Sequence, residues 1–442
     1  MMTQGNYNQI KNIQDQIIKL VNKFVELNYK KPEFIPGVSE IPVSGKIIGQ
    51  NETKNMVEAV LDGWLTTGRF NDEFEKKLSK YLNIKSLITV NSGSSANLLA
   101  LSALTSDVFK ERAIKPGDEV ITVATSFPTT VNPIFQNGAI PVFVDIKLPT
   151  YNINEKLIER AISKKTKAIM IAHTLGNPFN INAVLELCKK NNLWLIEDNC
   201  DALGSLYEKK FSGTFGDIGT LSFYPAHHIT MGEGGAVFTN NLRIKRTLES
   251  FRDWGRDCYC KTGCENTCKK RFDWQLGNLP YGYDHKYIYS HIGFNMKITD
   301  IQAACGLGQL EHLDTFVDKR RKNFNFLKNQ LQELEEVLIL PEAEKNSNPS
   351  WFGFPISINK KSKIDRRFII NKLTENKIGT RLLFAGNITK QPAYLKKNFK
   401  ISDSLTNTDF VMNNTFWVGI FPGIGEEELN FTAKIIKNCF KN

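Results

Sequence analysis

Short apolar runs that alternate with amphipathic segments are the feature that most constrains how this chain can fold. Seven such runs lie between residues 85 and 240: SLITVN, EVITVAT, IPVFVDI, AIMIAHT, LWLIEDN, IGTLSFY and GGAVFTN. Helical patterns such as SSANLLALSAL and NINAVLELCKKNN separate several of them. Apolar strands joined by helices predict a mostly parallel sheet covered on both faces, with ligands at the strand ends. We therefore expect an α/β protein whose large domain contains a seven-stranded sheet.

The 442-residue chain is expected to have three parts. Residues 1–45 read as an N-terminal arm, because a helical pattern is followed by the proline-bearing connector KKPEFIPGVSEIPVSG. Residues 46–315 form the predicted large domain, which includes an irregular segment at 254–295 that is too long for an ordinary connection. Residues 316–442 are expected to form a smaller C-terminal α+β domain, with FPISI, IGTRLLF and FWVGI as candidate strands.

The formal net charge of +11 raises the question of nucleic-acid binding. Lys and Arg are spread along the chain and are matched locally by Asp and Glu, so no basic patch for a nucleic acid is predicted. No apolar run of 18 residues occurs, and the N-terminus lacks the apolar core of a signal peptide. We expect a cytoplasmic protein that binds neither nucleic acid nor membranes.

Polar motifs follow three of the predicted strands. TVNSGSSANLLAL places Gly93, Ser94 and Ser95 between a strand and a helix, where they either hold a phosphate or cap the helix. LWLIEDNCDALGS ends a buried strand at Asp198, which either caps a helix or pairs with a protonated ring nitrogen. SFYPAHHITMGEGG follows the next strand with two histidines and a glycine cluster. In this order the three motifs outline a pyridoxal-phosphate site.

With these motifs, the chain from about residue 45 to the C-terminus resembles the DegT/DnrJ/EryC1/StrS family of sugar-nucleotide aminotransferases. The resemblance implies the aspartate aminotransferase fold (fold type I of the PLP-dependent transferases), a nucleotide-sugar substrate and a homodimer. In that family the pattern S-F-x-x-x-K, followed by GEGG, carries the lysine that binds the cofactor covalently. Ser222 and Phe223 match this pattern, but His227 occupies the lysine position.

The resemblance also implies roles for residues around the cofactor. Asp198 matches the acid that pairs with the pyridine nitrogen, and Phe127 matches an aromatic ring that stacks on the cofactor. Asn295 matches a position that reaches the phosphate from the partner subunit. The remaining phosphate ligands are expected at Gly93, Ser94, Ser95 and Ser222.

A histidine at the lysine position changes the expected chemistry. Imidazole cannot form a stable imine, so we expect a non-covalently held cofactor, pyridoxamine 5′-phosphate, with the pyridoxal form also open. A neutral histidine is a suitable base for the C4′ proton, and the released electrons can expel a neighbouring hydroxyl group. We therefore expect a dehydratase with His227 as the base and with Tyr224 and Asp201 as further catalytic candidates, whereas His228 is expected to be structural.

Histidine variants of this family are of two kinds, and both make 3-deoxy sugars. One kind is regenerated by an amino donor such as glutamate. The other kind, which resembles the CDP-4-keto-6-deoxyglucose 3-dehydrase of lipopolysaccharide 3,6-dideoxyhexose (O-antigen) biosynthesis, carries a [2Fe–2S] cluster. An NAD(P)H-dependent flavin/iron–sulfur reductase supplies that cluster with electrons.

Five cysteines are candidates for a metal site that needs four ligands. Cys258, Cys260, Cys264 and Cys268 could hold zinc within the segment RDCYCKTGCENTCKKRF. The 3-dehydrase pattern instead has one distant cysteine, a C-x-C pair and a fourth cysteine after seven more residues. The chain matches that pattern with a set of four: Cys200, Cys258, Cys260 and Cys268.

The combined expectation is a lyase that uses pyridoxamine phosphate to remove the C3 hydroxyl of a CDP-4-keto-6-deoxyhexose. With electrons from the reductase and the [2Fe–2S] cluster, it would yield a 4-keto-3,6-dideoxy sugar nucleotide. Two alternatives stay open. The first is a glutamate-regenerated 3-dehydratase or aminotransferase without electron transfer, and the second is an inactive scaffold protein stapled by zinc.

Overall fold

The computed structural model describes residues 4–260 and 263–441. Its main sheet contains the seven predicted strands, and the strand order places the C-terminal ends of β5 and β8 side by side. All pairs are parallel except those of β9, which runs antiparallel to both neighbours. The strands, in spatial order, are β1 (Ser86–Val90), β9 (Gly235–Thr239), β8 (Ile218–Ser222), β5 (Trp194–Asp198), β4 (Thr166–Ala172), β2 (Glu119–Val123), β3 (Ile140–Val144) and β14 (Lys400–Ile401).

The eighth strand, β14, comes from the C-terminal part of the chain and was not predicted. It pairs in parallel with β3 at the edge of the sheet, with Lys400 opposite Val142. The expected seven-stranded sheet is therefore extended by one short strand, while the predicted mostly parallel α/β fold is confirmed.

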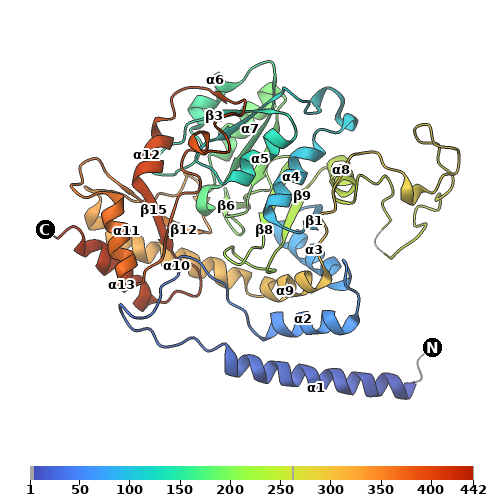
Figure 1. Cartoon of the computed structure of the whole chain (residues 1–442), viewed down its shortest axis with the longest axis horizontal. Coiled ribbons are helices and arrows are strands. Elements are labelled where there is room, and N and C mark those ends of the chain that lie inside the picture. Colours follow the sequence, from blue (N-terminus) through green and yellow to red (C-terminus); the bar gives the residue numbers. More distant parts are fainter. Residues whose placement is uncertain (1–3, 261–262, 442) are drawn as a thin grey trace.

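Helices cover both faces of this sheet because alternate residues of each strand are apolar on both sides (Figure 1). Met170 and Ile196 pack in one core with α4 and α8, whereas Ile169 and Ile171 pack in another core with α7. The α-helices between residues 50 and 310 are α2 (Gln50–Asp62), α3 (Arg69–Leu82), α4 (Gly93–Ala103), α5 (Pro128–Gln136), α6 (Ile158–Ala161), α7 (Ile181–Asn191), α8 (Leu242–Arg252) and α9 (Asp300–Leu310).

The C-terminal part forms a four-stranded antiparallel sheet flanked by helices, and its three longest strands lie where they were predicted. Its strands are β10 (Leu338–Ile339), β12 (Gly353–Ile358), β15 (Thr415–Gly419) and β13 (Thr380–Leu382). Its helices are α10 (Leu313–Leu331), α11 (Arg366–Glu375), α12 (Thr406–Asn414) and α13 (Glu426–Asn438). Because α10 runs through the predicted boundary at residue 315, the division into domains stays a prediction.

Smaller elements connect these parts. A three-stranded sheet contains β11 (Ser347–Asn348), β6 (Leu206–Tyr207) and β7 (Lys210–Phe211). It links the C-terminal part to the segment that connects β5 and β8 of the large sheet. Short 3-10 helices are η1 (Asp107–Arg112), η2 (Glu155–Leu157), η3 (Thr174–Gly176), η4 (His285–Tyr287), η5 (Gln332–Leu334) and η6 (Ile388–Lys390).

The N-terminal arm begins with the long helix α1 (Gln4–Asn28), which lies along α2 at the edge of the molecule (Figure 1). After α1, the connector crosses to the C-terminal part, where Lys31 Nζ donates a hydrogen bond to the carbonyl oxygen of Gly423 at 2.9 Å and pairs with Glu428. Over residues 4–260 and 263–441, none of the helices has the length and apolar character needed to cross a membrane.

Candidate active site

The carboxyl end of β5 places Asp198 at the centre of a hydrogen-bonded group. Its side chain is 5% exposed. Asn97 Nδ2 of α4 and Thr130 Oγ1 of α5 each donate to Oδ2 at 2.7 Å. The backbone N–H of Cys200 donates to Oδ1 at 3.1 Å. Asp198 is therefore a fixed acceptor at the sheet edge, and its partners Asn97 and Thr130 were not identified from the sequence.

Gly93, Ser222 and Cys200 meet between the first turn of α4 and the ends of β5 and β8. A Cβ atom added to Gly93 would lie 2.3 Å from Ser222 Cβ and 3.1 Å from Cys200 Sγ. Gly235, the last glycine of GEGG, supports the same turn, because a Cβ atom there would lie 2.4 Å from the carbonyl oxygen of Ser92 and 2.7 Å from the nitrogen of Gly93. Glycine is required at both positions by close packing.

The serines at the start of α4 divide into two groups. Ser92 caps the helix, since its Oγ accepts from the backbone N–H of Ser95 at 3.0 Å and also contacts Ser95 Oγ at 3.0 Å. The capping alternative is thus observed for Ser92 and Ser95. Ser94 is exposed in the first turn of the helix, where backbone N–H groups lack intrahelical acceptors. A phosphate role for Ser94 and Ser95 stays a prediction.

His227 lies in the turn after β8, against residues from β5 and from the C-terminal part. Its Nδ1 is 3.4 Å from Asp201 Oδ1, and its ring centroid is 5.1 Å from that of Phe352. The side chains of His227 and Asp201 are 15% and 14% exposed. Nδ1 has no hydrogen-bond partner among the described residues. His227 is therefore enclosed, and its Nδ1 faces Asp201 without a hydrogen bond within the described residues.

Arg320 of α10 holds this turn from behind, and sequence reasoning missed it. Its guanidinium is buried and donates to the carbonyl oxygens of His227 at 3.2 Å, Ala226 at 3.5 Å, Trp351 at 3.3 Å and Phe352 at 3.1 Å. Burial lowers the pKa of Arg320 to about 9, so it remains charged near pH 7. Arg320 thus joins the His227 turn to the chain entering β12.

The electrostatics of the turn keep His227 neutral. Burial, followed by the charge of Arg320, lowers the pKa of His227 to about 4. Burial, followed by the charge of Asp198, raises the pKa of Asp201 to about 8. Although the two side chains are within ion-pair distance, both are neutral near pH 7. His227 is therefore an unprotonated imidazole beside a carboxylic acid that can ionise when a positive charge forms nearby.

His228 has a structural contact, as expected. Its Nε2 hydrogen-bonds the carbonyl oxygen of Ser350 at 2.8 Å, and its side chain is buried. Burial lowers its pKa well below the usual value. The ring is thus a neutral donor that ties the turn to the residues before β12.

The other predicted site residues lie at exposed positions. Phe127 precedes α5, is 53% exposed, and packs edge-on against Phe384 with ring centroids 6.3 Å apart. Tyr224 is exposed, and its carbonyl oxygen accepts from the N–H of His227 at 2.9 Å. Asn295 is also exposed, next to an isolated β-bridge with Asp253. Their roles toward a cofactor stay predictions.

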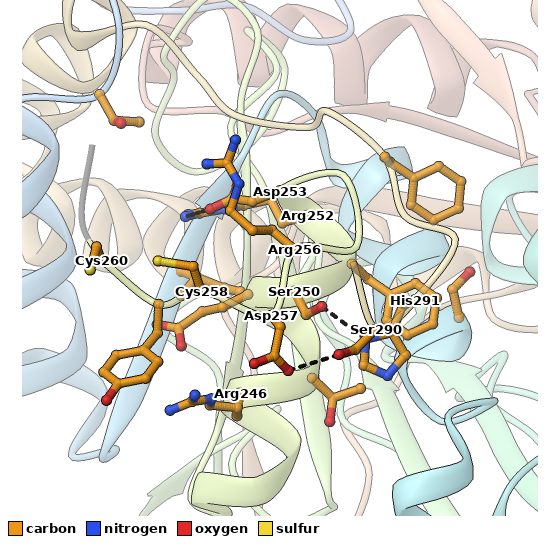
Figure 2. A pocket seen from close by; sticks show the side chains of 18 of the residues that line it. Arg246, Ser250, Arg252, Asp253, Arg256, Asp257, Cys258, Cys260, Ser290 and His291 are labelled. Carbon is orange, nitrogen blue, oxygen red and sulfur yellow. Dashed lines mark hydrogen bonds and ion pairs between the residues drawn. The ribbon is translucent and has the colours of Figure 1, made fainter. Parts of the chain in front are cut away.

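The cysteine-rich segment borders an open cavity of about 1360 Å³ next to α8. Figure 2 shows Cys258 and Cys260 on one side of this cavity and Ser290 and His291 on the other. In the described part of the chain, the cavity lining does not include Asp198 or His227. This cavity is therefore separate from the His227 turn.

The four predicted cluster ligands are not assembled in the structure. Cys200 lies by Gly93 and Thr220, whereas Cys258 lines the cavity with Cys260. Over residues 4–260 and 263–441, no three His, Cys, Asp or Glu side chains are grouped as metal ligands. The structure therefore supports neither the [2Fe–2S] set nor the zinc set that includes Cys264.

The cysteines of the segment still influence one another. Burial, together with the neighbouring Cys260 and Cys268, raises the pKa of Cys258. Partial burial alone would raise the pKa of Cys260. Hydrogen bonds with Thr267, whose Oγ1 donates to Cys260 Sγ at 3.0 Å, and with Cys258 and Cys268 instead lower this pKa to about 7. Cys258 and Cys260 thus lie close enough to Cys268 for their pKa values to respond to it, although among the described residues the three are not grouped as metal ligands.

The fold and the site together define a class: an α/β protein with the fold of the PLP-dependent transferases, in which an acid, a glycine-serine turn and a GEGG loop meet at the sheet edge. Residues 46–437 match the DegT/DnrJ/EryC1/StrS aminotransferase family. The chain belongs to this family.

Three similar proteins illustrate the family. The chain is 59% identical to the lipopolysaccharide biosynthesis protein RfbH of Salmonella typhimurium, over 97% of this chain and 98% of that protein. It is 48% identical to the dTDP-4-dehydro-2,6-dideoxy-D-glucose 3-dehydratase of Saccharopolyspora spinosa, over 96% and 91%. A solved GDP-4-keto-6-deoxymannose-3-dehydratase with a trapped PLP-glutamate geminal diamine superimposes with a TM-score of 0.80 at 27% identity, over 90% of this chain and 100% of that one.

The residues fit a pyridoxal-type cofactor that is not covalently attached. Asp198 is a buried acceptor for a ring nitrogen, and the turn at Gly93 brings backbone N–H groups close to Ser222. His227 lies near the same group of residues, because its Nδ1 is 3.4 Å from Asp201 Oδ1 and the charge of Asp198 acts on its pKa. No lysine occurs between Lys210 and Lys245, so this turn cannot supply an imine-forming amine.

Proposed function

We propose that the protein is a pyridoxamine-phosphate-dependent 3-dehydratase of a 4-keto-6-deoxy sugar nucleotide and that it works as a homodimer. The observation that carries the proposal is the neutral, enclosed His227 at the position where the family pattern has lysine. The 48% identity to a dTDP-sugar 3-dehydratase supports the reaction type. The family aminotransferases carry a lysine at this position, so its replacement by His227 favours a dehydratase over an aminotransferase.

Asp198, Gly93, Ser94 and Ser222 are the residues that hold the cofactor in this proposal. The carboxylate of Asp198, fixed by Asn97 Nδ2 and Thr130 Oγ1, accepts a hydrogen bond from the protonated ring nitrogen. When bound, pyridoxamine phosphate supplies an amine for the sugar ketone and a conjugated ring that accepts the electrons of the C4′–H bond.

His227 removes the C4′ proton. Its low pKa keeps the imidazole unprotonated, so the base is available throughout the neutral range. As the imidazole gains its proton, Asp201 next to Nδ1 loses its own proton more readily, because a positive charge now lies 3.4 Å away. If the Asp201 proton passes to the departing hydroxyl group, which then leaves as water, the carboxylate of Asp201 balances the charge of the imidazolium in the buried turn.

In the first route, hydrolysis releases the 4-keto product and the amino nitrogen of the cofactor leaves as ammonia, so an amino donor such as glutamate is needed to restore the amine form. The dehydratase solved with a PLP-glutamate adduct supports this route. The route with a [2Fe–2S] cluster and a reductase is a second candidate, favoured by the proximity of Cys258, Cys260 and Cys268. That second route would place the chain in the synthesis of 3,6-dideoxyhexoses for lipopolysaccharide, and the similarity to a lipopolysaccharide biosynthesis protein supports the lipopolysaccharide setting.

The test is a panel of CDP-, dTDP- and GDP-4-keto-6-deoxyhexoses incubated with protein, pyridoxamine phosphate and glutamate. Loss of the C3 hydroxyl, monitored by mass spectrometry, supports the proposal. The nucleotide of the sugar that reacts fastest tests the prediction that the substrate carries CDP. Turnover with glutamate alone identifies the first route. Turnover that requires iron and a chemical reductant identifies the second, and transfer of an amino group to the sugar would refute both.

A further inference from the structure

The outward face of α1 carries a second apolar stripe besides the one that packs on α2. The inner stripe contains Val25, which is buried, and Ile18 and Val21, which are partly buried. The outer stripe has the spacing of alternating three and four residues that is typical of a coiled-coil seam. Its members are Ile10, Ile13, Ile17, Leu20, Phe24 and Leu27.

Five of the six residues of the outer stripe are exposed in the single chain, and Ile17 is partly buried. Ile10, Ile13, Leu20, Phe24 and Leu27 are between 41% and 68% exposed. The helix itself is held in place, because Gln50 Nε2 of α2 donates to Glu26 Oε1 at 2.9 Å. Figure 1 shows α1 along the outer edge of the molecule, on the side of α2 away from the sheet. A continuous apolar seam on a fixed helix indicates an interaction surface.

The seam is compatible with a second copy of itself in an antiparallel arrangement. In an antiparallel pair of helices, the first seam position of each heptad faces the second seam position of the other helix. If α1 pairs with a second α1 in this way, Ile10 faces Leu27, Ile13 faces Phe24, and Ile17 faces Leu20 of the other copy. All six residues are used, and no seam position is left without an apolar partner.

The residues beside the seam also permit self-pairing. They are Gln9, Gln14, Gln16, Val21, Lys23 and Asn28, so Lys23 is the only charged residue among them. In the antiparallel register, Lys23 lies beside Gln16 of the other copy instead of beside a second Lys23. Like charges therefore do not oppose the contact.

We propose that α1 forms an antiparallel helix pair with α1 of a second copy of this chain. With six residues on each side, the pair falls short of the roughly 20–30 residues a side of a stable interface, so it would add to the main interface of the homodimer proposed above. α1 lies outside residues 46–437, the segment that matches the family, so the contact is an addition to the shared fold. The inference does not depend on the proposed reaction.

Chemical cross-linking of two single-cysteine variants of the full chain tests both the contact and its direction. In the antiparallel register the two copies of residue 20 are offset by about 4.5 Å along the helix axis, and the two copies of residue 27 by about 25 Å. A short bismaleimide should therefore join Leu20→Cys to itself across the dimer but should not join Leu27→Cys. Mass spectrometry of the cross-linked α1 peptide separates this product from reactions of the native cysteines.

Sedimentation velocity of a charged variant gives an independent measure. Leu20→Glu combined with Phe24→Glu should weaken self-association by about tenfold or more, because two apolar side chains lose their burial. Lys19→Glu, on the same helix but outside the seam, should leave self-association unchanged. The proposal is overturned if the chain stays monomeric, if residue 20 gives no cross-link in the dimer, or if residues 20 and 27 cross-link equally.

Discussion

At the residue scale, Arg320 decides how His227 is held and how basic it is. Its guanidinium contacts four carbonyl oxygens, and its charge adds to burial in lowering the pKa of His227. Arg320→Lys keeps the charge but loses the planar fork that reaches several acceptors. Arg320→Met loses both. The two variants therefore separate positioning from electrostatics.

Their pH profiles should differ. Because the pKa of His227 is low, the acid limb of kcat/KM for the intact protein should lie below pH 6, where an ordinary histidine would already be protonated. Arg320→Met should move that limb to higher pH, since one cause of the lowered pKa is removed. Arg320→Lys should lower kcat without moving the limb. Equal pH profiles in all three proteins would show that Arg320 has only a structural role.

Restoring the family lysine tests the role of position 227 in holding the cofactor. His227→Lys should bind pyridoxal phosphate covalently, seen as a yellow absorbance that borohydride fixes to the chain. Dehydration should fall by about 100-fold or more, because the lysine amine is then occupied by the cofactor. His228→Lys is the matched control, since His228 contacts Ser350 and is not at the family position. Unchanged dehydration in His227→Lys would exclude His227 as the base.

Much of the candidate site could be predicted from the sequence, because strand ends and turns carry local signals. Asp198 and Ser222 end apolar strands, and Gly93 lies in a strand-to-helix turn, so their meeting at one sheet edge follows from the fold. Arg320 could not be found in this way. It lies in a charged stretch of α10 that is typical of a solvent-facing helix, and only tertiary packing buries it.

At the scale of elements, GEGG acts through β9 on the first turn of α4. Gly235→Ala should displace that turn, because the added Cβ atom would lie 2.4 Å from the carbonyl oxygen of Ser92. We expect affinity for pyridoxamine phosphate to fall by about tenfold or more, measured by fluorescence titration, while far-UV circular dichroism is retained. Gly49→Ala is the control, since its Cβ atom would meet only Glu52 Oε2 at 3.4 Å. Equal affinities would show that the turn tolerates the displacement.

The elements themselves were predictable where apolar runs are long. The seven strands of the large sheet each bury almost their whole length, and such runs stand out in the sequence. β14 has two exposed residues, Lys400 and Ile401, and therefore no periodicity that could reveal it. The segment 254–295 lacks apolar periodicity as well, so its path around the cavity became visible only in the structure.

At the scale of the whole molecule, the positions of the cysteines distinguish the glutamate route from the route with a [2Fe–2S] cluster. The structure places Cys200 at the cofactor turn and Cys258 at the cavity, with no ligand group among the described residues. We expect anaerobically purified protein to turn over with glutamate and without stoichiometric iron. Two iron and two sulfide per chain, lost in Cys258→Ser but retained in Cys188→Ser, would instead establish the cluster route.

The central claim is that His227 moves the proton at C4′, and isotope exchange at that atom measures it directly. Protein loaded with pyridoxamine phosphate and a 4-keto-6-deoxy sugar nucleotide is incubated in deuterium oxide, and the cofactor is then analysed by mass spectrometry. We predict deuterium at C4′ in the wild type and an exchange rate about 100-fold or more lower in His227→Asn, with cofactor affinity unchanged. Equal exchange rates in the two proteins would contradict the claim.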